Sequence, residues 1–428
     1  MIRLFLLLAF GVCIASCSPV SKRSLGKQFR NTEELFQEHT GFALFDLTTN
    51  KTVFEYNGNK YFTPASNTKI FTFYAALRLL GDSIPAFKYQ ERGDSLIMWG
   101  TGDPSLLNRN VHYSPDAFNF LQASNRKLFL STATFHTTAL GSGWAWDDYN
   151  DYYSAERSPF PIYGNIILVE ADGGNVRVTP SYFGQFVSYV ADDDSGAVVR
   201  SVDSNILTVH RPIRKGLKRE VPARITPDLV ARLLSDTLGR PVTVLTTLPG
   251  NGTKIFYHQP ADSVYKVMMQ ESDNFIAEQL LLACAATIGD TLKPELTIEH
   301  MKKRYFGDLP DPAFWVDGSG LSRYNLFTPR TIVALWRKIY AEVPRERLFQ
   351  LLAIGGKAGT IKNYYKAPQP YIFGKTGSLS NNHCLSGYLV TRSGKTLIFS
   401  FMNSNFTVAT AEVRKNMQRI LNLIYEKY

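Results

Sequence analysis

The sequence predicts an α+β protein in which both ends of the chain form one domain around a β-rich insertion. Apolar residues recur with helical period after residue 66 and again from Ala409 to Tyr425. The middle of the chain is instead rich in short β-like runs separated by turn residues, at Ser95–Trp99, Asn165–Glu170, Asn175–Val178 and Ala197–Val202. This contrast places the insertion between two parts of a single helix-containing domain.

The expected boundaries follow from these patterns. Residues 28–80 and 261–428 would form the domain that contains both chain ends, and residues 81–260 the inserted domain. The first domain is expected to combine helices with an antiparallel sheet, from a helix near Thr32–Glu38, strands at Gly41–Leu47 and Thr52–Tyr56, a helix from about residue 66, strands at Leu385–Val390 and Thr396–Met402, and the final amphipathic helix.

The first residues are typical of a signal peptide, expected to span residues 1–16. Arg3 precedes the apolar run Leu4–Ile14, which is shorter than the roughly 20 residues of a membrane-spanning helix. Ile14-Ala15-Ser16-Cys17 resembles a bacterial lipobox, so we expect a lipid anchor on Cys17; the alternative is a plain secretory cleavage site. Residues 17–27 would then form a polar tether, with the body of the protein in the periplasm.

The composition is that of an ordinary globular protein, with 428 residues, 44% hydrophobic and 20% charged. The net charge of +10 comes from scattered basic residues, apart from a cluster at residues 211–219. This cluster is expected to be a solvated loop; attraction to anionic lipid or wall polymer is the alternative. Because the protein is expected to be exported, nucleic acid is not an expected partner.

Cysteine and histidine usage excludes some classes of site. After processing, Cys284 and Cys384 remain; Cys284 lies in an apolar run and is expected to be a buried thiol, and whether the two pair stays open. The seven histidines show no metal-ligand spacing, so we expect neither a metal nor another cofactor.

Ser66 and Lys69 are the first candidate catalytic residues. Ser-x-x-Lys occurs four times in the sequence, but only this copy follows a proline and opens an apolar helix. On a helix, residues three apart lie on one face. Burial among apolar side chains lowers the pKa of a lysine, which then becomes able to take the proton of a serine hydroxyl. A plain helix cap with a solvated lysine is the alternative interpretation.

Two further motifs follow in order. Ser272-Asp273-Asn274 precedes a helix expected from Phe275 to about Ala286, and Lys375-Thr376-Gly377 ends a short apolar strand. Gly377 would let a substrate backbone lie against the strand edge. Taken alone, the first motif is ordinary N-cap chemistry and the second an edge-strand lysine. The three motifs together, each on a suitable element, indicate a serine acyltransferase that needs no histidine.

Longer strings make the resemblance specific. The three motifs and their flanks resemble those of the peptidase S13 family, the D-alanyl-D-alanine carboxypeptidases/endopeptidases also called class C low-molecular-mass penicillin-binding proteins. Similar strings are Gly100-x-Gly102-Asp103-Pro104, Gly141-x-Gly143-Trp144-x-Trp146-Asp147-Asp148 and Asp317-Gly318-Ser319-Gly320-Leu321-Ser322-Arg323. The resemblance covers nearly the whole mature chain and implies the fold of penicillin-binding proteins and serine β-lactamases for the domain that carries the motifs.

The resemblance also implies a role for each motif residue. Ser66 would attack the carbonyl between two terminal D-alanines of a muropeptide, with Lys69 as its base, and Ser272 and Lys375 would relay a proton to the leaving amine. Substrate would be bound by Asn274 (peptide backbone), Lys375 and Thr376 (terminal carboxylate), Gly377 (strand edge), the backbone N–H groups of Ser66 and Ser378 (oxyanion), and Asp148 (amine of diaminopimelate). β-Lactams are expected to be covalent inhibitors.

Two other functions remain open from the sequence. A β-lactamase would share the three motifs, but a class A enzyme needs a glutamate-activated water. The one Glu-x-x-x-Asn string in the chain, Glu412 to Asn416, lies in the final helix, where it is out of place. The other alternative is an inactive wall-binding lipoprotein that keeps the fold; the presence of all required side chains argues against it.

Overall fold

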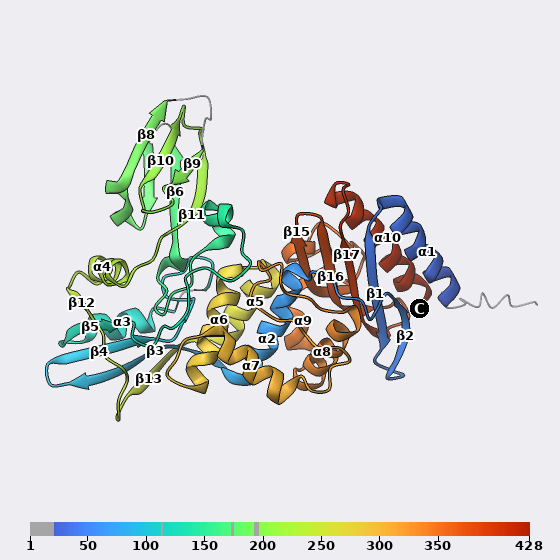
Figure 1. The fold of residues 1–428 in the computed structure, drawn as a ribbon, viewed down its shortest axis with the longest axis horizontal. Helices are drawn as coiled ribbons and strands as arrows, with labels where there is room; N and C mark the ends of the chain where they lie inside the picture. Colours follow the sequence, from blue (N-terminus) through green and yellow to red (C-terminus); the bar gives the residue numbers. More distant parts are fainter. Residues whose placement is uncertain (1–20, 113, 173–174, 192–196) are drawn as a thin grey trace, which may run out of the picture.

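A six-stranded antiparallel sheet forms one half of the protein (Figure 1). The computed structural model describes residues 21–428 except 113, 173–174 and 192–196, so the predicted signal peptide and Cys17 lie outside the described residues. In spatial order the strands are β14 (Ala353–Ile354), β15 (Ile372–Leu379), β16 (Asn382–Val390), β17 (Thr396–Ser404), β1 (His39–Asp46) and β2 (Lys51–Tyr56). The first and last segments of the chain therefore share one sheet.

Helices cover both faces of this sheet. On one face lie α1 (Lys22–Phe36) and α10 (Thr410–Lys427), whose apolar side chains pack with the sheet in one core. On the other face lie α2 (Lys69–Leu79), α5 (Ala261–Gln270), α6 (Asn274–Ile288), α7 (Pro294–Tyr305), α8 (Pro329–Glu342) and α9 (Arg345–Leu351), which form a second core. The predicted α+β fold, with an antiparallel sheet flanked by helices, is confirmed.

The start of the chain differs from the expectation. Residues 22–27 were expected to belong to the tether, but they form the first turns of α1, which ends at Phe36. Leu25 and Phe29 are buried, and the Phe29 ring lies 4.7 Å from Phe42 and 5.3 Å from Phe401 between centroids. Burial of these side chains against the sheet stabilises a helix, whereas the polar local sequence favoured an extended tether.

Three further sheets of the described residues lie between Ser83 and Pro260. One contains β3 (Ser83–Arg92), β4 (Ser95–Gly100), β5 (Lys127–Ser131), β12 (Val242–Leu245) and β13 (Lys254–Pro260). The others contain β6 (Ile166–Asp172), β7 (Asn175–Thr179) and β11 (Leu217–Pro222), and β8 (Val187–Ala191), β9 (Val198–Arg200) and β10 (Leu207–Arg211). Helices α3 (Asp116–Ala123) and α4 (Pro227–Leu238) pack among them around a separate core. This separate core supports the proposed division at residues 81–260, which stays a prediction.

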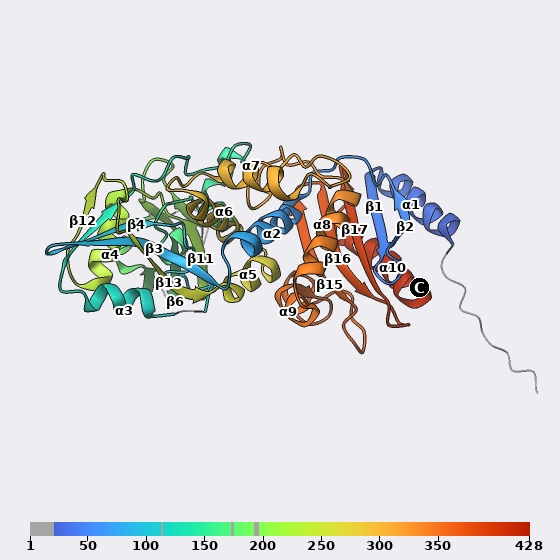
Figure 2. The same cartoon turned by 90° about the horizontal axis from the view of Figure 1, so that it is seen from below.

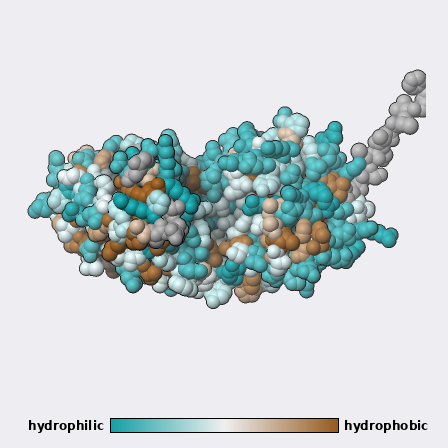
Figure 3. Space-filling model, turned by 90° about the horizontal axis from the view of Figure 1, so that it is seen from above, coloured by the Kyte–Doolittle hydropathy of each residue, from teal (hydrophilic) through white to brown (hydrophobic). Residues whose placement is uncertain are grey.

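Helices α2, α5 and α6 lie between the six-stranded sheet and the insertion (Figures 1 and 2). In the described part of the chain, short 3₁₀ helices connect larger elements at Ala65–Thr68 (η1), Trp146–Asn150 (η2), Tyr152–Ser154 (η3), Tyr163–Asn165 (η4), Ser181–Phe186 (η5) and Gly359–Ile361 (η6). From above, the surface is mainly hydrophilic, with scattered hydrophobic patches on both halves (Figure 3). Among the described helices, none combines the length and the apolar character required to span a membrane.

Candidate active site

Ser66 and Lys69 lie together at the start of the central helix. Ser66 is in η1, and Lys69 is the first residue of α2. The Lys69 side chain is fully buried, and its Nζ donates to Ser66 Oγ over 2.8 Å. The helix predicted from residue 66 thus begins with a 3₁₀ turn, which Ala65 enters in the left-handed region (φ +48°). This turn presents Ser66 to the cleft while Lys69 stays inside.

Lys69 donates two further hydrogen bonds, to Asn274 Oδ1 over 2.6 Å and to the backbone oxygen of Ser319 over 2.7 Å. Burial lowers the pKa of Lys69 to about 8, although the carboxylates of Asp317 and Asp273 act in the opposite direction. An amine with such a pKa has a substantial neutral fraction near neutral pH. Lys69 therefore has the position and the proton affinity of a general base for Ser66.

The second and third motifs meet at Ser272 and Lys375. Lys375 is fully buried, and its Nζ donates to Ser272 Oγ over 2.7 Å and to the backbone oxygen of Thr376 over 2.8 Å. Burial and then the charge of Lys69 hold the pKa of Lys375 well below its usual value. Asp273 caps α6 by accepting from the backbone N–H of Ile276, and Asn274 begins the helix. The fold thus places two serine–lysine pairs beside one another.

Gly377 has a packing role that the sequence did not predict. A Cβ on this residue would lie 2.5 Å from the backbone oxygen of Pro64 and 2.9 Å from the backbone nitrogens of Ser66 and Asn67. These distances are shorter than side chains tolerate, so glycine is required for β15 to approach η1. The glycine is therefore needed for the contact with the turn that carries Ser66, and its predicted role at the substrate-binding strand edge stays a prediction.

Buried hydrogen bonds fix β15 against this turn. Asn67 Nδ2 donates to the backbone oxygen of Lys375 over 2.9 Å, and Ser386 Oγ donates to Asn67 Oδ1 over 2.6 Å. Trp336 Nε1 donates in turn to Ser386 Oγ over 2.9 Å. Because all four residues are buried, each bond is formed in a place where water cannot replace it. The network holds the two lysines in a fixed relation.

The segment Asp317–Arg323 connects Lys69 to the insertion. Asp317 accepts from the backbone N–H groups of Gly320 (2.8 Å) and Ser322 (2.7 Å) and from Trp144 Nε1 (3.0 Å). Glu278 on α6 accepts from the Ser319 N–H over 2.7 Å and lies 3.5 Å from Arg157. The carbonyl of Ser319 is thereby directed at Lys69. The resemblance included this segment, but no local pattern indicated that its backbone holds the lysine.

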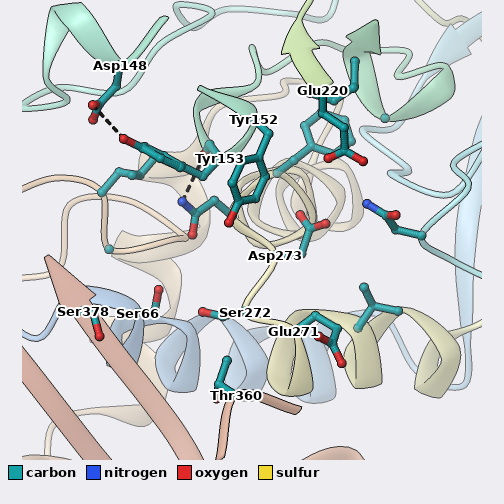
Figure 4. Close-up of a pocket in the computed structure, with 18 of the residues that line it drawn as sticks. Ser66, Asp148, Tyr152, Tyr153, Glu220, Glu271, Ser272, Asp273, Thr360 and Ser378 are labelled. Carbon is teal, nitrogen blue, oxygen red and sulfur yellow. Dashed lines mark hydrogen bonds between the residues drawn. The ribbon is translucent and has the colours of Figure 1, made fainter. Parts of the chain in front are cut away.

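A cleft of about 1000 Å³ opens above these residues. Ser66, Ser272 and Ser378 lie along one wall, and the facing wall, from the insertion, carries Asp148, Tyr152, Tyr153 and Glu220 (Figure 4). Tyr153 donates from its hydroxyl to Asp148 over 2.9 Å, and its backbone oxygen accepts from Asn274 Nδ2 over 3.0 Å. The cleft is therefore formed by both halves of the protein.

The remaining predicted site residues line the same cleft. Thr376 donates to Thr360 Oγ1 over 2.7 Å, and Ser378 Oγ lies 2.8 Å from His383 Nδ1. Burial and then the charge of Arg414 lower the pKa of His383 to about 3, so this imidazole is neutral. Cys284 and Cys384 are both buried and free, which settles the open question of their pairing.

Sequence reasoning missed several residues that line the cleft. They are charged or aromatic and belong to no quoted motif: Tyr152, Tyr163, Arg414 and Arg109, which pairs with Glu220. Arg323, at the end of the segment Asp317–Arg323, also lines the cleft, although no role was predicted for it. Among the described residues, histidine, cysteine and acidic side chains form no group of three able to hold a metal ion.

The comparison with known protein families agrees with this site. A model of the D-Ala-D-Ala carboxypeptidase 3 (S13) family matches residues 22–427. The chain belongs to this family. The resemblance predicted from the motifs is therefore confirmed.

Individual relatives match over most of their length. D-alanyl-D-alanine carboxypeptidase DacB of Haemophilus influenzae is 26% identical over 86% of this chain and 86% of its own length. D-alanyl-D-alanine carboxypeptidase of Actinomadura sp. is 25% identical over 85% of this chain and 77% of its own length. The crystal structure of penicillin-binding protein 4 (dacB) from Haemophilus influenzae superposes with a TM-score of 0.76 at 21% identity, covering 93% and 99% of the two chains, which supports the fold.

Proposed function

We propose that this protein is a serine-type D-Ala-D-Ala carboxypeptidase that cleaves peptidoglycan stem peptides through an acyl-enzyme on Ser66. The main observation that supports this proposal is the 2.8 Å hydrogen bond between Ser66 Oγ and a fully buried Lys69 whose pKa is about 8. A serine hydroxyl needs a neighbouring base to become a nucleophile at neutral pH, and Lys69 fits that requirement. Family membership and the names of the relatives support the choice of substrate.

In the first step, Ser66 Oγ attacks the carbonyl carbon between the two terminal D-alanines, and its proton passes to Lys69. Backbone N–H groups of Ser66 and Ser378 stabilise the oxyanion; loss of one such donor typically costs about 100- to 1,000-fold in rate. Asn274 binds the substrate backbone, and Lys375 with Thr376 binds the terminal carboxylate. Gly377 allows the close contact between β15 and η1 on which this geometry depends.

In the second step, the tetrahedral intermediate breaks and D-alanine leaves. The proton that Lys69 took from Ser66 is relayed through Lys375 and the hydroxyl of Ser272, which accepts from Lys375 over 2.7 Å, to the leaving amine, so that Lys69 is neutral again when water attacks the ester. Water then hydrolyses the ester on Ser66. Asp148 lies on the facing wall, and in this proposal it binds the amine of diaminopimelate through the carboxylate that Tyr153 orients.

The same chemistry extends to cross-links, because cleavage between D-alanine and diaminopimelate also transfers the acyl group of D-alanine to Ser66. β-Lactams would acylate Ser66 in the same way and leave slowly. A β-lactamase would differ from the proposed enzyme by releasing them rapidly. A wall-binding protein without activity would fail to react with either class of compound.

The location of the protein is also a proposal. A signal peptide over residues 1–16 and a lipid on Cys17 would anchor the protein to a bacterial membrane, with the remainder of the chain in the periplasm. Because α1 begins at Lys22, the tether between the lipid and the folded body would be only a few residues long. Metabolic labelling with a radioactive fatty acid, compared with a Cys17→Ala variant, tests the anchor.

The direct test of the function uses purified muropeptides. The protein is incubated with a pentapeptide monomer ending in D-Ala-D-Ala and, separately, with a cross-linked dimer, and the products are separated and weighed by mass spectrometry. We expect loss of one D-alanine from the monomer and, where cross-links are substrates, two monomers from the dimer. No change in either mass, together with no covalent reaction with penicillin, would support the inactive alternative.

A further inference from the structure

The outer side of α1 carries a row of basic side chains. Arg23, Lys27 and Arg30 are all exposed, and they follow one another at intervals of four and three residues, so they lie along one side of the helix. Leu25 and Phe29, which are buried, lie on the opposite side. We call these three cations the α1 stripe. The stripe faces away from the core that α1 helps to form.

The charge of the α1 stripe is not neutralised by its own surroundings. The segment from Ser21 to Thr32 contains four basic residues and no acidic one. Among the described residues, no ion pair joins a cation of the stripe to a carboxylate. The first turn of α1 has no acidic residue, although the positive partial charge at the start of a helix disfavours cations there. The stability of the helix therefore does not account for the stripe.

A cation from α10 extends this positive surface. Arg419 is exposed, and it donates to Gln28 of α1 over 2.6 Å and to Asn416 over 2.8 Å. Both partners are neutral amides, so neither offsets the charge of the guanidinium. The stripe is also remote from the insertion, because α1 and the insertion lie at opposite ends of the molecule (Figures 1 and 2).

We propose that the α1 stripe, together with Arg419, binds the headgroups of anionic phospholipids at a membrane surface. Its position favours a membrane over an anionic wall polymer. Arg23 follows Cys17, the proposed lipid site, by six residues, a stretch that spans at most about 20 Å. Clustered lysine and arginine residues beside a lipid anchor add electrostatic attraction to the hydrophobic attachment. With α1 on the membrane, the insertion is directed away from it (Figure 1).

Vesicle co-sedimentation tests this surface without the contribution of a lipid anchor. The chain from Ser18 to Tyr428 holds every helix and strand described above, and it is mixed with vesicles of phosphatidylcholine, with or without about 30% phosphatidylglycerol. We expect binding only to the vesicles that contain phosphatidylglycerol. A variant that combines Arg23→Gln, Lys27→Gln and Arg30→Gln should bind about 100-fold more weakly, at about fivefold for each cation removed.

The matched control removes the same charge elsewhere. Lys302→Gln, Lys303→Gln and Arg304→Gln together change three exposed residues at the end of α7, which lies on the other face of the sheet, and this variant should keep the wild-type affinity. An equal loss in the two triple variants would show that net charge alone acts. Equal binding to both kinds of vesicle would exclude the anionic headgroups. Either result overturns the proposal.

Two further measurements separate a membrane from a wall polymer. When the intact protein is added to both kinds of vesicle, the amide hydrogens of α1 should exchange more slowly with phosphatidylglycerol present, and the α1 triple variant should lose this protection. Sedimentation with insoluble peptidoglycan should not distinguish the α1 variant from the wild type. If the variant loses binding to peptidoglycan and keeps its binding to vesicles, the stripe recognises wall polymer and the proposal is wrong.

Discussion

The two walls of the cleft differ in how their side chains are held. On the wall formed by η1, α2, α6 and β15, Lys69 and Lys375 are fully buried, and every hydrogen bond they donate goes to another residue of the site. On the wall formed by the insertion, Tyr152 is 61% exposed, and the Asp148 carboxylate accepts from Tyr153, a residue of the same wall. The catalytic lysines thus lie on a buried wall, where hydrogen bonds fix their positions.

This difference suggests a division of labour. Buried groups with all their hydrogen bonds made have fixed positions and shifted pKa values. Acylation by any substrate requires catalytic groups of this kind. Half-exposed groups on the insertion are hydrated and adjust more easily, which suits the selection of one substrate over another. Substitutions on the two walls should therefore have effects of different size and kind.

The largest effect should follow loss of the nucleophile. Ser66→Ala removes the only oxygen that forms the proposed acyl-enzyme, and we expect release of D-alanine to fall by about 10,000-fold or more. The measurement is enzymatic assay of D-alanine released from a pentapeptide. Ser263→Ala is the matched control because Ser263 belongs to another Ser-x-x-Lys string, outside the cleft, and should leave the rate unchanged.

Gly377→Ala tests whether the contact between β15 and η1 is needed. The added Cβ would meet backbone atoms at 2.5–2.9 Å, so β15 and η1 must separate. A displacement of about 1 Å in a catalytic group typically costs about 100-fold, and we expect a loss of that size in the rate of penicillin acylation. Gly307→Ala, at a glycine with no atom within 4 Å of the new Cβ, should have no effect. Equal rates in both variants would contradict the account.

The pH dependence of acylation tests the role of Lys69. Its pKa in the folded protein is about 8, and only the neutral amine has a lone pair for the Ser66 proton. The rate should therefore fall about tenfold per pH unit below that value and level off above it. Stopped-flow measurement with a chromogenic β-lactam gives the profile. Lys69→Arg, which keeps a charge at all these pH values, should be slow throughout; a flat wild-type profile would exclude Lys69 as the base.

Loss of a buried link should affect stability. Ser386→Ala leaves Asn67 Oδ1 and Trp336 Nε1 without their bond to the Ser386 hydroxyl in a buried place. We expect the free energy of unfolding to fall by about 1–3 kcal/mol, measured by urea denaturation. Ser393→Ala, in the exposed turn after β16, serves as the control and should change the stability by less than about 0.5 kcal/mol.

The smallest effect on acylation is expected from the insertion wall. Tyr153→Phe removes the hydrogen bond to Asp148 but keeps the backbone oxygen that accepts from Asn274. Acylation by penicillin should change by less than about threefold, while KM for a diaminopimelate-containing stem peptide should rise by about three- to tenfold. Loss of penicillin acylation comparable to that in Gly377→Ala would show that the two walls are not separable.

The sequence predicted what depends on local pattern. The strands at β4, β7, β16 and β17 and the helix after Asp273 were expected close to their observed bounds, because alternation and capping are local signals. The prediction for the beginning of α1 was wrong, since the burial of Leu25 and Phe29 depends on Phe401, which lies at the other end of the chain. No local sequence pattern indicates a contact with a residue so far away in the chain.

The candidate site follows the same rule. The three motifs identified residues that the fold brings together, because each motif consists of three or four consecutive residues and can be recognised locally. The carbonyl of Ser319, the charge of Arg414 and the pair Arg109–Glu220 have no such string, and they enter the site only through tertiary structure. The need for glycine at Gly377 in the contact with η1 was not predicted, because η1 is far away in the sequence.

The most direct test is intact-protein mass spectrometry after exposure to benzylpenicillin, followed by digestion to locate the adduct. The account predicts one penicilloyl group per molecule, on the peptide that contains Ser66, and its slow loss after excess drug is removed. An unmodified mass, or an adduct on any other residue, would contradict the claim that the buried Lys69 activates Ser66 as the nucleophile of this cleft.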